Sequence, residues 1–210
     1  MPKPVRTVQY NRGCEEMTFP TILSGSSIQL LPLELSCAEG LFACGTDSRI
    51  WTYLPNKVET REDMDQMIQS ALESQRQGTD HPYAVYSSDL GKLVGSTRFL
   101  NISIPNKQLE IGWTWYTPEV WRTRVNTECK YTLLKYSFEE FKAVRVQFKA
   151  DIRNDRSNRA IERIGAVREG MLRQDRILHD GYIRNSYLYS IIDTEWPAVK
   201  ERLEQYLNID

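Results

Sequence analysis

The chain has 210 residues, with 27 lysines and arginines against 28 aspartates and glutamates, and a formal net charge of −1. This length fits one domain of ordinary size, which can bury roughly 70% of its unfolded surface without covalent cross-links. The nearly balanced charge argues against a general nucleic-acid binder and provides no attraction to a membrane surface.

The cysteine, histidine and apolar content of the chain further limits the classes of protein to which it could belong. The four cysteines show no C-x-x-C spacing and there are only two histidines, so we expect no metal site. A domain of this size needs no disulfide framework. The N-terminus has no apolar stretch of signal length, and no segment is long enough to span a bilayer. We therefore expect a cytoplasmic protein with no membrane or nucleic-acid partner.

The first half of the chain is predicted to be rich in strands. Residues 1–20 lack periodicity and contain three prolines, so we expect a loose arm there and a single domain over 21–210. Thr60 followed by Asp63 is typical of a capping box at a helix start. The elements predicted after the arm are strand 28–33, helix 34–44, a loop of exposed aromatics at 51–55, a helix from Thr60 to Gly78, and strands 83–86, 93–100 and 109–116.

The second half alternates helices with strands. Pro118 stops the preceding strand because proline has no N–H for the ladder. The elements predicted next are helix 125–141, strand 144–150, helix 157–164 ending at Gly165, two strands around the tight turn Asp180-Gly181, and a last helix capped by Thr194. Strands in succession first, with helices crossing between later strands, predict an α+β fold with a single sheet.

The stretch from Gly112 to Ala166 contains the clearest chemical signal. A loop with Arg122 and Arg124 opens directly into a helix. The free N–H groups of the first turn and the positive end of the helix dipole point at the same spot, which favours phosphate. Asn154 and Ser157 stand where the chain leaves the next strand. Together these segments predict a nucleotide-type cofactor between two strand ends.

Several segments resemble the GNAT superfamily of acetyl-CoA-dependent N-acetyltransferases, in particular its branch of ribosomal-protein N-terminal acetyltransferases. They are Gly95-Ser96-Thr97-Arg98-Phe99, Glu110-Ile111-Gly112-Trp113, the helix start at 121–128, and Asn154-x-x-Ser157 with Ile164-Gly165-Ala166. The resemblance covers nearly the whole chain past Pro20. It implies a mixed, mostly antiparallel twisted sheet with helices on both faces, acetyl-CoA as co-substrate, and a primary amine as acceptor on a protein N-terminus or small molecule.

The resemblance places the cofactor along the loop and first helical turn. The implied contacts are Arg122, Thr123, Arg124, Val125, Asn126 and Thr127, with Trp115 beside them. The family's loop has two glycines, which here are replaced by Arg122 or Thr123 and by Arg124. Arginine can compensate through charge-assisted contacts to phosphate. The alternative is that Thr123 only caps the helix and that the arginines are solvated.

Glu110 is the candidate general base. In relatives of the ribosomal-protein branch a glutamate at this strand position is the proposed base, acting through water. The alternative is a strand-edge glutamate paired with a surface arginine. Strand alternation predicts Glu110, Gly112 and Thr114 on one face, with Trp113 and Trp115 on the other. The resemblance also implies a backbone oxyanion donor near Trp113 to Trp115.

The leaving thiolate needs a donor of its own. Many members of the family use a tyrosine at the position of Ile161, which cannot donate. The ribosomal-protein branch has an earlier serine, which aligns with Ser157, and Asn154 would hold the pantetheine arm. The alternative is that Asn154 and Ser157 only start the helix.

The acceptor cannot be deduced from the residues. By resemblance Trp51, Tyr53 and Trp113 would surround it, although such aromatic residues could equally belong to the core. The acidic stretch 62–65 could attract a basic acceptor or be the solvated face of a helix.

Other functions remain open at this point. An inactive GNAT-fold protein that binds acyl-CoA as a sensor or interaction module is the main alternative, because the loop glycines and the tyrosine are missing. A peptide-binding module without cofactor is a third reading, and a longer acyl donor is not excluded. The last strands, with Tyr182, Tyr187 and Tyr189, could pair across a homodimer or cover the core.

Overall fold

The computed structural model describes residues 9–10 and 17–209. The predicted loose arm over 1–20 therefore lies largely outside the described residues. Two short strands in this region, β1 (Gln9–Tyr10) and β2 (Met17–Thr18), pair antiparallel. Phe19 is 2% exposed and its ring stacks on His81 with centroids 5.1 Å apart. The packed part of the chain thus begins before residue 21.

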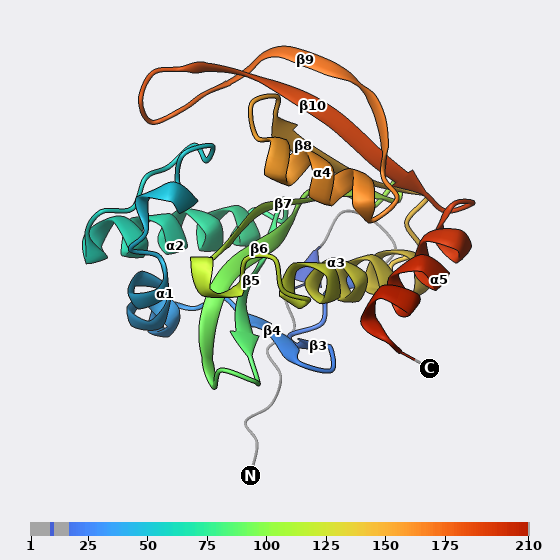
Figure 1. Cartoon of the computed structure of the whole chain (residues 1–210), viewed down its shortest axis with the longest axis horizontal. Helices are drawn as coiled ribbons and strands as arrows, with labels where there is room; N and C mark the ends of the chain where they lie inside the picture. The colour runs from blue at the N-terminus through green and yellow to red at the C-terminus, as the bar shows by residue number, and fades with distance from the viewer. Residues whose placement is uncertain (1–8, 11–16, 210) are drawn as a thin grey trace.

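An eight-stranded sheet organises the described chain, in the order β3-β4-β5-β6-β7-β8-β10-β9 (Figure 1). Its strands are β3 (Leu23–Ser24), β4 (Ile28–Pro32), β5 (His81–Ser87), β6 (Lys92–Ser103), β7 (Gln108–Tyr116), β8 (Arg145–Asp151), β9 (Val167–Ile177) and β10 (Ile183–Ile192). Neighbouring strands run antiparallel except β7 and β8, which are parallel. The predicted mixed, mostly antiparallel sheet is confirmed.

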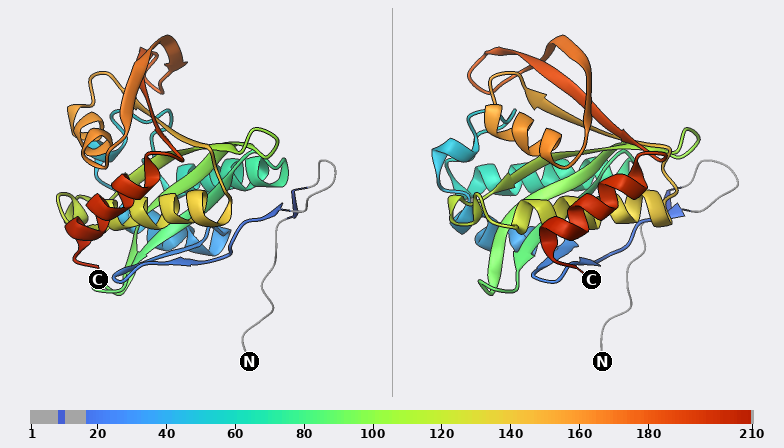
Figure 2. Two further views of the ribbon diagram at one scale, coloured as in Figure 1. Left: turned by 90° about the vertical axis from the view of Figure 1, so that its right-hand side faces the viewer. Right: turned by 45° about the vertical axis from the view of Figure 1, so that its right-hand side comes forward.

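Helices cover both faces of this sheet (Figures 1 and 2). The helices are α1 (Ala38–Cys44), α2 (Arg61–Arg76), α3 (Val125–Lys135), α4 (Asp155–Arg163) and α5 (Trp196–Leu207). Helices α1 and α2 pack on β6 and β5, α3 packs on α5 on the other face, and α4 lies against β8. Shorter turns are η1 (Leu35–Cys37), η2 (Ser48–Ile50), η3 (Pro118–Val120) and the π-helical turn η4 (Tyr136–Glu140). The α+β prediction is confirmed.

Two helix starts test the capping predictions. The capping box of α2 is confirmed, because Thr60 Oγ1 accepts a hydrogen bond from the Asp63 N–H at 3.2 Å and the Asp63 carboxylate accepts from the Thr60 N–H at 2.8 Å. The prediction that Thr194 caps α5 is wrong. Glu195 holds the N-cap position, and its carboxylate accepts from the backbone N–H of Ile192 at 3.0 Å.

Apolar side chains form one cluster on each face of the sheet. The larger cluster joins α3, α4 and α5 to the strands and includes the fully buried Tyr189. The smaller cluster lies under α1 and α2 and includes Met64 and Trp115. Tyr189 therefore covers the core, whereas pairing across a homodimer stays a prediction. In the described part of the chain, no helix has both the length and the apolar character that crossing a membrane requires.

Candidate active site

A cleft opens where the two parallel strands diverge. Strands β7 and β8 are paired only from Gln108 with Arg145 to Glu110 with Gln147. Beyond that point they separate, and a cleft of about 580 Å³ extends between them to the starts of α3 and α4. The loop after α1 and the β9–β10 hairpin contribute the remaining walls. Most of the predicted site residues come from these elements.

A β-bulge shapes the β7 side of the cleft. Gly112 lies opposite Arg98 and Trp115 opposite Ser96, so β7 has one more residue than β6 between these pairs. Trp113 adopts a positive φ of 51° there. The predicted alternation is therefore wrong after Gly112, because the bulge returns Trp115 to the face of Glu110 and Gly112. A bulge also leaves backbone N–H groups outside the ladder.

Glu110 is buried at the base of the divergence, with 5% of its surface exposed. Its Oε2 accepts hydrogen bonds from Asn101 Nδ2 at 3.0 Å and Gln147 Nε2 at 2.8 Å, and lies 3.5 Å from Lys149 Nζ. Oε1 has no hydrogen-bond partner among the described residues, and Glu110 lines the cleft. Glu110 therefore forms its ion pair with Lys149, inside the site. The alternative, a pair with a surface arginine, is wrong.

The loop before α3 keeps a glycine-like conformation without glycine. Arg122 has a φ of 64°, in the left-handed region that glycine adopts most easily. Arg124 has a helical φ of −68° at the N-cap of α3. Thr123 Oγ1 accepts from the Val125 N–H at 3.3 Å and donates to the Val120 carbonyl at 2.8 Å. Thr123 thus bonds the first helical N–H from the position before the cap. The alternative that Thr123 is the N-cap is wrong, because Arg124 holds that position.

The residues predicted for the phosphate loop separate into two groups. Arg122, Thr123 and Asn126 line the cleft. Val125 is buried in the core, and Thr127 is buried with its hydroxyl accepting from Arg163 Nη2 at 2.9 Å. Their side chains do not face the cleft, so only their backbone N–H groups could serve a ligand there.

Arg124 points away from the cleft, contrary to the prediction that it contacts the cofactor. Its guanidinium donates to the Leu207 carbonyl and to Ser26 Oγ, both at 3.1 Å, and lies 3.3 Å from Glu128. Glu128 is fully buried, and its carboxylate also accepts from the backbone N–H of Ser27 at 2.7 Å and from Ser27 Oγ at 2.5 Å. Arg124 therefore belongs to a clip that ties α3 to the β3–β4 turn and α5.

Helix α4 borders the opposite wall. It begins at Asp155, two residues before the prediction, and Asn154 caps it by accepting from the Ser157 N–H at 3.0 Å. This confirms the helix-start alternative for Asn154. Both Asn154 and Ser157 also line the cleft. Capping and ligand contact are therefore compatible for this pair.

Arginines gather at the mouth between α3 and α4. Arg122, Arg156, Arg159 and Arg163 all line the cleft, and none of them has a carboxylate partner among the described residues. The Arg156 guanidinium lies 3.8 Å from the Trp121 ring centroid. Desolvation and then the charges of Arg49 and Arg122 lower the pKa of Arg156 from its ordinary value. Such a cluster of uncompensated cations favours a polyanion.

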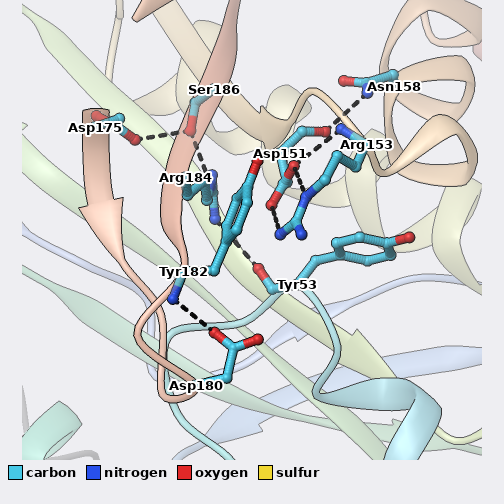
Figure 3. Close-up of polar contacts among 9 residues, drawn as sticks. All are labelled: Tyr53, Asp151, Arg153, Asn158, Asp175, Asp180, Tyr182, Arg184 and Ser186. Atoms are coloured by element: carbon cyan, nitrogen blue, oxygen red, sulfur yellow. Dashed lines mark hydrogen bonds and ion pairs between the residues drawn. The ribbon is translucent and has the colours of Figure 1, made fainter. Parts of the chain in front are cut away.

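Beside the cleft, an arginine lies between two tyrosines (Figure 3). Of these three residues, Tyr53 lines the cleft, whereas Arg153 and Tyr182 are not among its lining residues. Arg153 is held by Asp151 at 2.7 Å, and its guanidinium lies 3.4 Å from the Tyr182 ring centroid and 5.6 Å from that of Tyr53. Arg184 donates to the Tyr53 carbonyl at 3.3 Å. The loop after α1 and the tip of the β9–β10 hairpin therefore meet beside the cleft.

The predicted acceptor residues differ in their placement. Tyr53 and Trp113 line the cleft. Trp51 is 1% exposed, its indole N–H donates to the Gly45 carbonyl at 2.9 Å, and its ring packs 5.1 Å from that of Trp115. The expectation of an exposed Trp51 is wrong, and its ring has no surface for an acceptor. The acidic stretch 62–65 does not line the cleft either.

Sequence reasoning missed Lys130, which lines the cleft from α3 with 6% exposure. Burial lowers its pKa from 10.5 to about 8. It also missed Lys149 and Asp175, which line the same cleft. A lysine directly after Cys129 on the apolar side of a helix was the available signal for Lys130. Asp175 and Lys149 reach the cleft through strand pairing that no local pattern specifies.

These features agree with the family to which the chain is similar in sequence. A sequence profile of the acetyltransferase (GNAT) domain matches residues 28–167. The chain therefore belongs to the GNAT acetyltransferases, and it is an acyltransferase.

Individual relatives support the same family. The chain is 27% identical over 158 residues to the uncharacterized N-acetyltransferase YoaA of Bacillus subtilis, covering 74% of this chain and 87% of that protein. It is 25% identical over 141 residues to the ribosomal-protein-serine acetyltransferase of Escherichia coli, covering 67% and 77%. The resemblance to the ribosomal-protein branch is confirmed by these matches.

Solved structures show the same fold. A GCN5-related N-acetyltransferase from Brucella melitensis is 27% identical with a TM-score of 0.83, covering 89% of this chain and 85% of that one. RimJ of Mycobacterium smegmatis, in complex with CoA-disulfide, is 17% identical with a TM-score of 0.73, covering 85% and 88%. At 17% identity, the similarity to RimJ shows a shared fold and nothing further.

Proposed function

We propose that this protein transfers an acetyl group from acetyl-CoA to a primary amine, on a protein N-terminus or a small molecule. The observation that carries the proposal is Glu110 at the base of the cleft. Its Oε2 is fixed by Asn101 and Gln147, its Oε1 has no hydrogen-bond partner among the described residues, and the residue lines the cleft. A carboxylate held in this way can accept a proton from an amine.

The residues at the mouth fit the phosphates of acetyl-CoA. The first-turn N–H groups of α3 and the arginines Arg122, Arg156, Arg159 and Arg163 converge there. Asn126 and Asn154 add amide groups along the wall that the pantetheine arm would follow. The left-handed backbone at Arg122 retains the loop shape that glycine usually provides. Acetyl-CoA supplies the acetyl group as a thioester, which is activated toward attack by an amine.

The chain's own groups would then divide the chemistry. Glu110 Oε1 takes the proton from the amine, directly or through water. Backbone N–H groups in the bulge at 113–114 face the negative charge that develops on the carbonyl oxygen, where fixed donors are most effective. Ser157 lines the wall beside Ile161, which has no donor. It is the hydroxyl available to the departing sulfur.

The acceptor is proposed to enter beneath the bridge formed by Tyr53, Arg153 and Tyr182. Trp113 and Asp175 line the cleft. The similarity to the ribosomal-protein-serine acetyltransferase of Escherichia coli supports a protein acceptor. A small amine remains the other acceptor class within the proposal.

Calorimetric titration with acetyl-CoA, followed by thiol release with a panel of amines, tests this function. The panel should contain peptides with free N-termini, the same peptides with blocked N-termini, and small amines. We expect saturable binding and thiol release that depends on a free amine. Absence of binding would overturn the proposal. Binding without amine-dependent thiol release across the panel would favour the sensor alternative.

A further inference from the structure

Lys130 has an unusual position for a lysine. It lies in the second turn of α3, and its side chain lines the cleft and reaches both β7 and β8. Its Nζ donates to Thr114 Oγ1 at 2.7 Å and lies 5.9 Å from the ring centroid of Phe148. Thr114 is in the β7 bulge and Phe148 is on β8, so the ammonium group sits between the two separating strands.

In the part of the chain that the structure describes, no carboxylate compensates this ammonium group. Lys130 has no ion pair among the described residues, although it is only 6% exposed. Burying a lone cation is unfavourable, and an apolar side chain of similar length would pack here without that penalty. The contacts with Thr114 and Phe148 provide one neutral acceptor and one ring. The remaining N–H donors of Nζ are available to a group in the cleft.

The position of Lys130 along the cleft indicates which group of a bound ligand would accept these hydrogen bonds. Glu110 marks the base of the divergence, and the start of α3 with its arginines marks the mouth. The side chain of Lys130 reaches the cleft between these two points, where it contacts Thr114. Thr114 is four residues beyond Glu110 on β7. In a thioester the sulfur connects the acyl carbon to the arm that leads to the phosphates. With the amine at Glu110 and the phosphates at the mouth, the sulfur lies on the stretch that Lys130 faces.

We infer that Lys130 is a catalytic residue that contacts the sulfur of the co-substrate and protonates it as it leaves. The inference rests on the proposed function. The amine nitrogen bonds to the acyl carbon, the C–S bond breaks, and its electron pair goes to sulfur. The ammonium of Lys130 gives one proton to that sulfur, and Glu110 has taken one from the amine, so the products are an amide and a thiol. Water exchanges protons with both side chains and restores them.

Burial supports this role by making the ammonium a better proton donor than an exposed lysine. The lowered pKa, about 8, lies closer to neutrality than the ordinary value of 10.5. A proton donor is most effective when its pKa lies near the operating pH. Lys130 would thus supply the proton from α3 that the tyrosine missing at Ile161 cannot supply from α4. Ser157, a neutral hydroxyl, would donate a hydrogen bond to the same sulfur without giving up its proton.

The test compares binding of CoA with binding of desulfo-CoA, which lacks the sulfur. We expect the wild type to bind CoA about tenfold more tightly, since a hydrogen bond to a charged group has roughly this value. Lys130→Met should lose this preference while keeping the wild-type affinity for desulfo-CoA. Lys130→Arg, which keeps the charge, should restore part of the preference. Lys135→Met, on the exposed side of the same helix, should keep all of it.

Two further measurements separate catalysis from structure. Lys130→Met should lower acetyl transfer by about 10²-fold, in the range of proton-transfer catalysis. It should not lower the melting temperature, because the substitution removes an uncompensated buried charge. A lysine retained for packing would show the reverse, with a lower melting temperature and an unchanged preference for CoA.

The contrary outcomes are distinct. Equal loss of CoA and desulfo-CoA binding in Lys130→Met would mean contact with the pantetheine arm and would overturn the inference. A preference that persists in Lys130→Met but disappears in Ser157→Ala would assign the sulfur to Ser157. Equal binding of both compounds by the wild type would overturn the inference and leave the proposed function standing. A wild type that binds neither would overturn both.

Discussion

Two buried glutamates of this molecule lie at similar depth and differ in how their oxygens are used. Glu128 has both oxygens engaged, by Ser26, Ser27 and Arg124. Within the described residues, the polar contacts of Glu110 are all on Oε2. A carboxylate with both oxygens engaged by the protein has no oxygen left for a ligand, whereas one with a single engaged oxygen can still accept a proton from a bound amine. The difference predicts stability effects at Glu128 and catalytic effects at Glu110.

The largest expected effect is on folding. Glu128→Gln would place amide N–H groups against the Ser27 donors and leave the clip without its charge. We expect the free energy of unfolding to fall by about 3 kcal/mol, measured by urea denaturation. Acetyl transfer per folded molecule should be nearly unchanged. Glu201→Gln, on the exposed face of α5, is the matched control. A loss no greater than in that control would contradict the structural role.

The next effect is on turnover. Glu110→Gln can still accept hydrogen bonds from Asn101 and Gln147 through its amide oxygen, so stability should change little. Without a base, turnover should fall by about 10²-fold, with acetyl-CoA affinity retained in calorimetry. Glu62→Gln, a solvated residue of α2, should retain full turnover. Full activity of Glu110→Gln would remove this residue from the mechanism.

A smaller effect separates the two loop arginines. Arg122 lines the cleft, so Arg122→Ala should weaken acetyl-CoA binding by about tenfold through loss of a charge-assisted contact. Arg124 contacts Glu128 and the end of α5, so Arg124→Ala should lower the melting temperature and leave acetyl-CoA affinity unchanged. Isothermal titration and thermal unfolding of both variants give the comparison. Equal weakening of binding by both would place Arg124 in the site after all.

The last prediction concerns pH. Burial would raise the pKa of Glu128, but hydrogen bonds from Ser27 and Ser26 and the charge of Arg124 outweigh it, so the pKa lies below the ordinary 4.5. The unfolded chain therefore binds this proton at a higher pH than the folded protein. The contribution of Glu128 is fully present above pH 4.5 and is lost as pH falls through the folded pKa.

Urea unfolding of the wild type and Glu128→Gln at decreasing pH measures this contribution. The difference in unfolding free energy between them should be constant at neutral pH and shrink below pH 4.5. A difference that widens on acidification would mean that Glu128 has a raised pKa.

The sequence predicted the elements of the fold and the position of the candidate base. Amphipathic spacing and turn residues gave most strands and helices, because these signals depend on near neighbours. The capping box of Thr60 and Asp63 was correct for the same reason. Thr194 failed as a cap because α5 begins at Trp196, which puts Glu195 and not Thr194 at the N-cap position.

The failures in the site come from contacts that no local pattern encodes. Alternation along β7 assumed a regular ladder, and the extra residue of the bulge moved Trp115 to the other face. Arg124 was assigned to phosphate because its partners, Ser26 and Leu207, lie far away in the sequence. Trp51 was expected in a loop wall, but its N–H bonds Gly45 and draws it into the core.

The bridge formed by Tyr53, Arg153 and Tyr182 beside the cleft bears on how fast the proposed acceptor can enter. Its two ring contacts involve an exposed guanidinium, and such contacts contribute about 0.5–1 kcal/mol each. Together they favour the closed arrangement by roughly tenfold. The Asp151–Arg153 pair can stay intact while Tyr53 and Tyr182 move apart. If an acceptor enters beneath this bridge, as proposed, the two tyrosine rings can leave Arg153 while the hydrogen bond from Arg184 to the Tyr53 carbonyl keeps the loop on the hairpin. Entry would then require no unfolding of the hairpin.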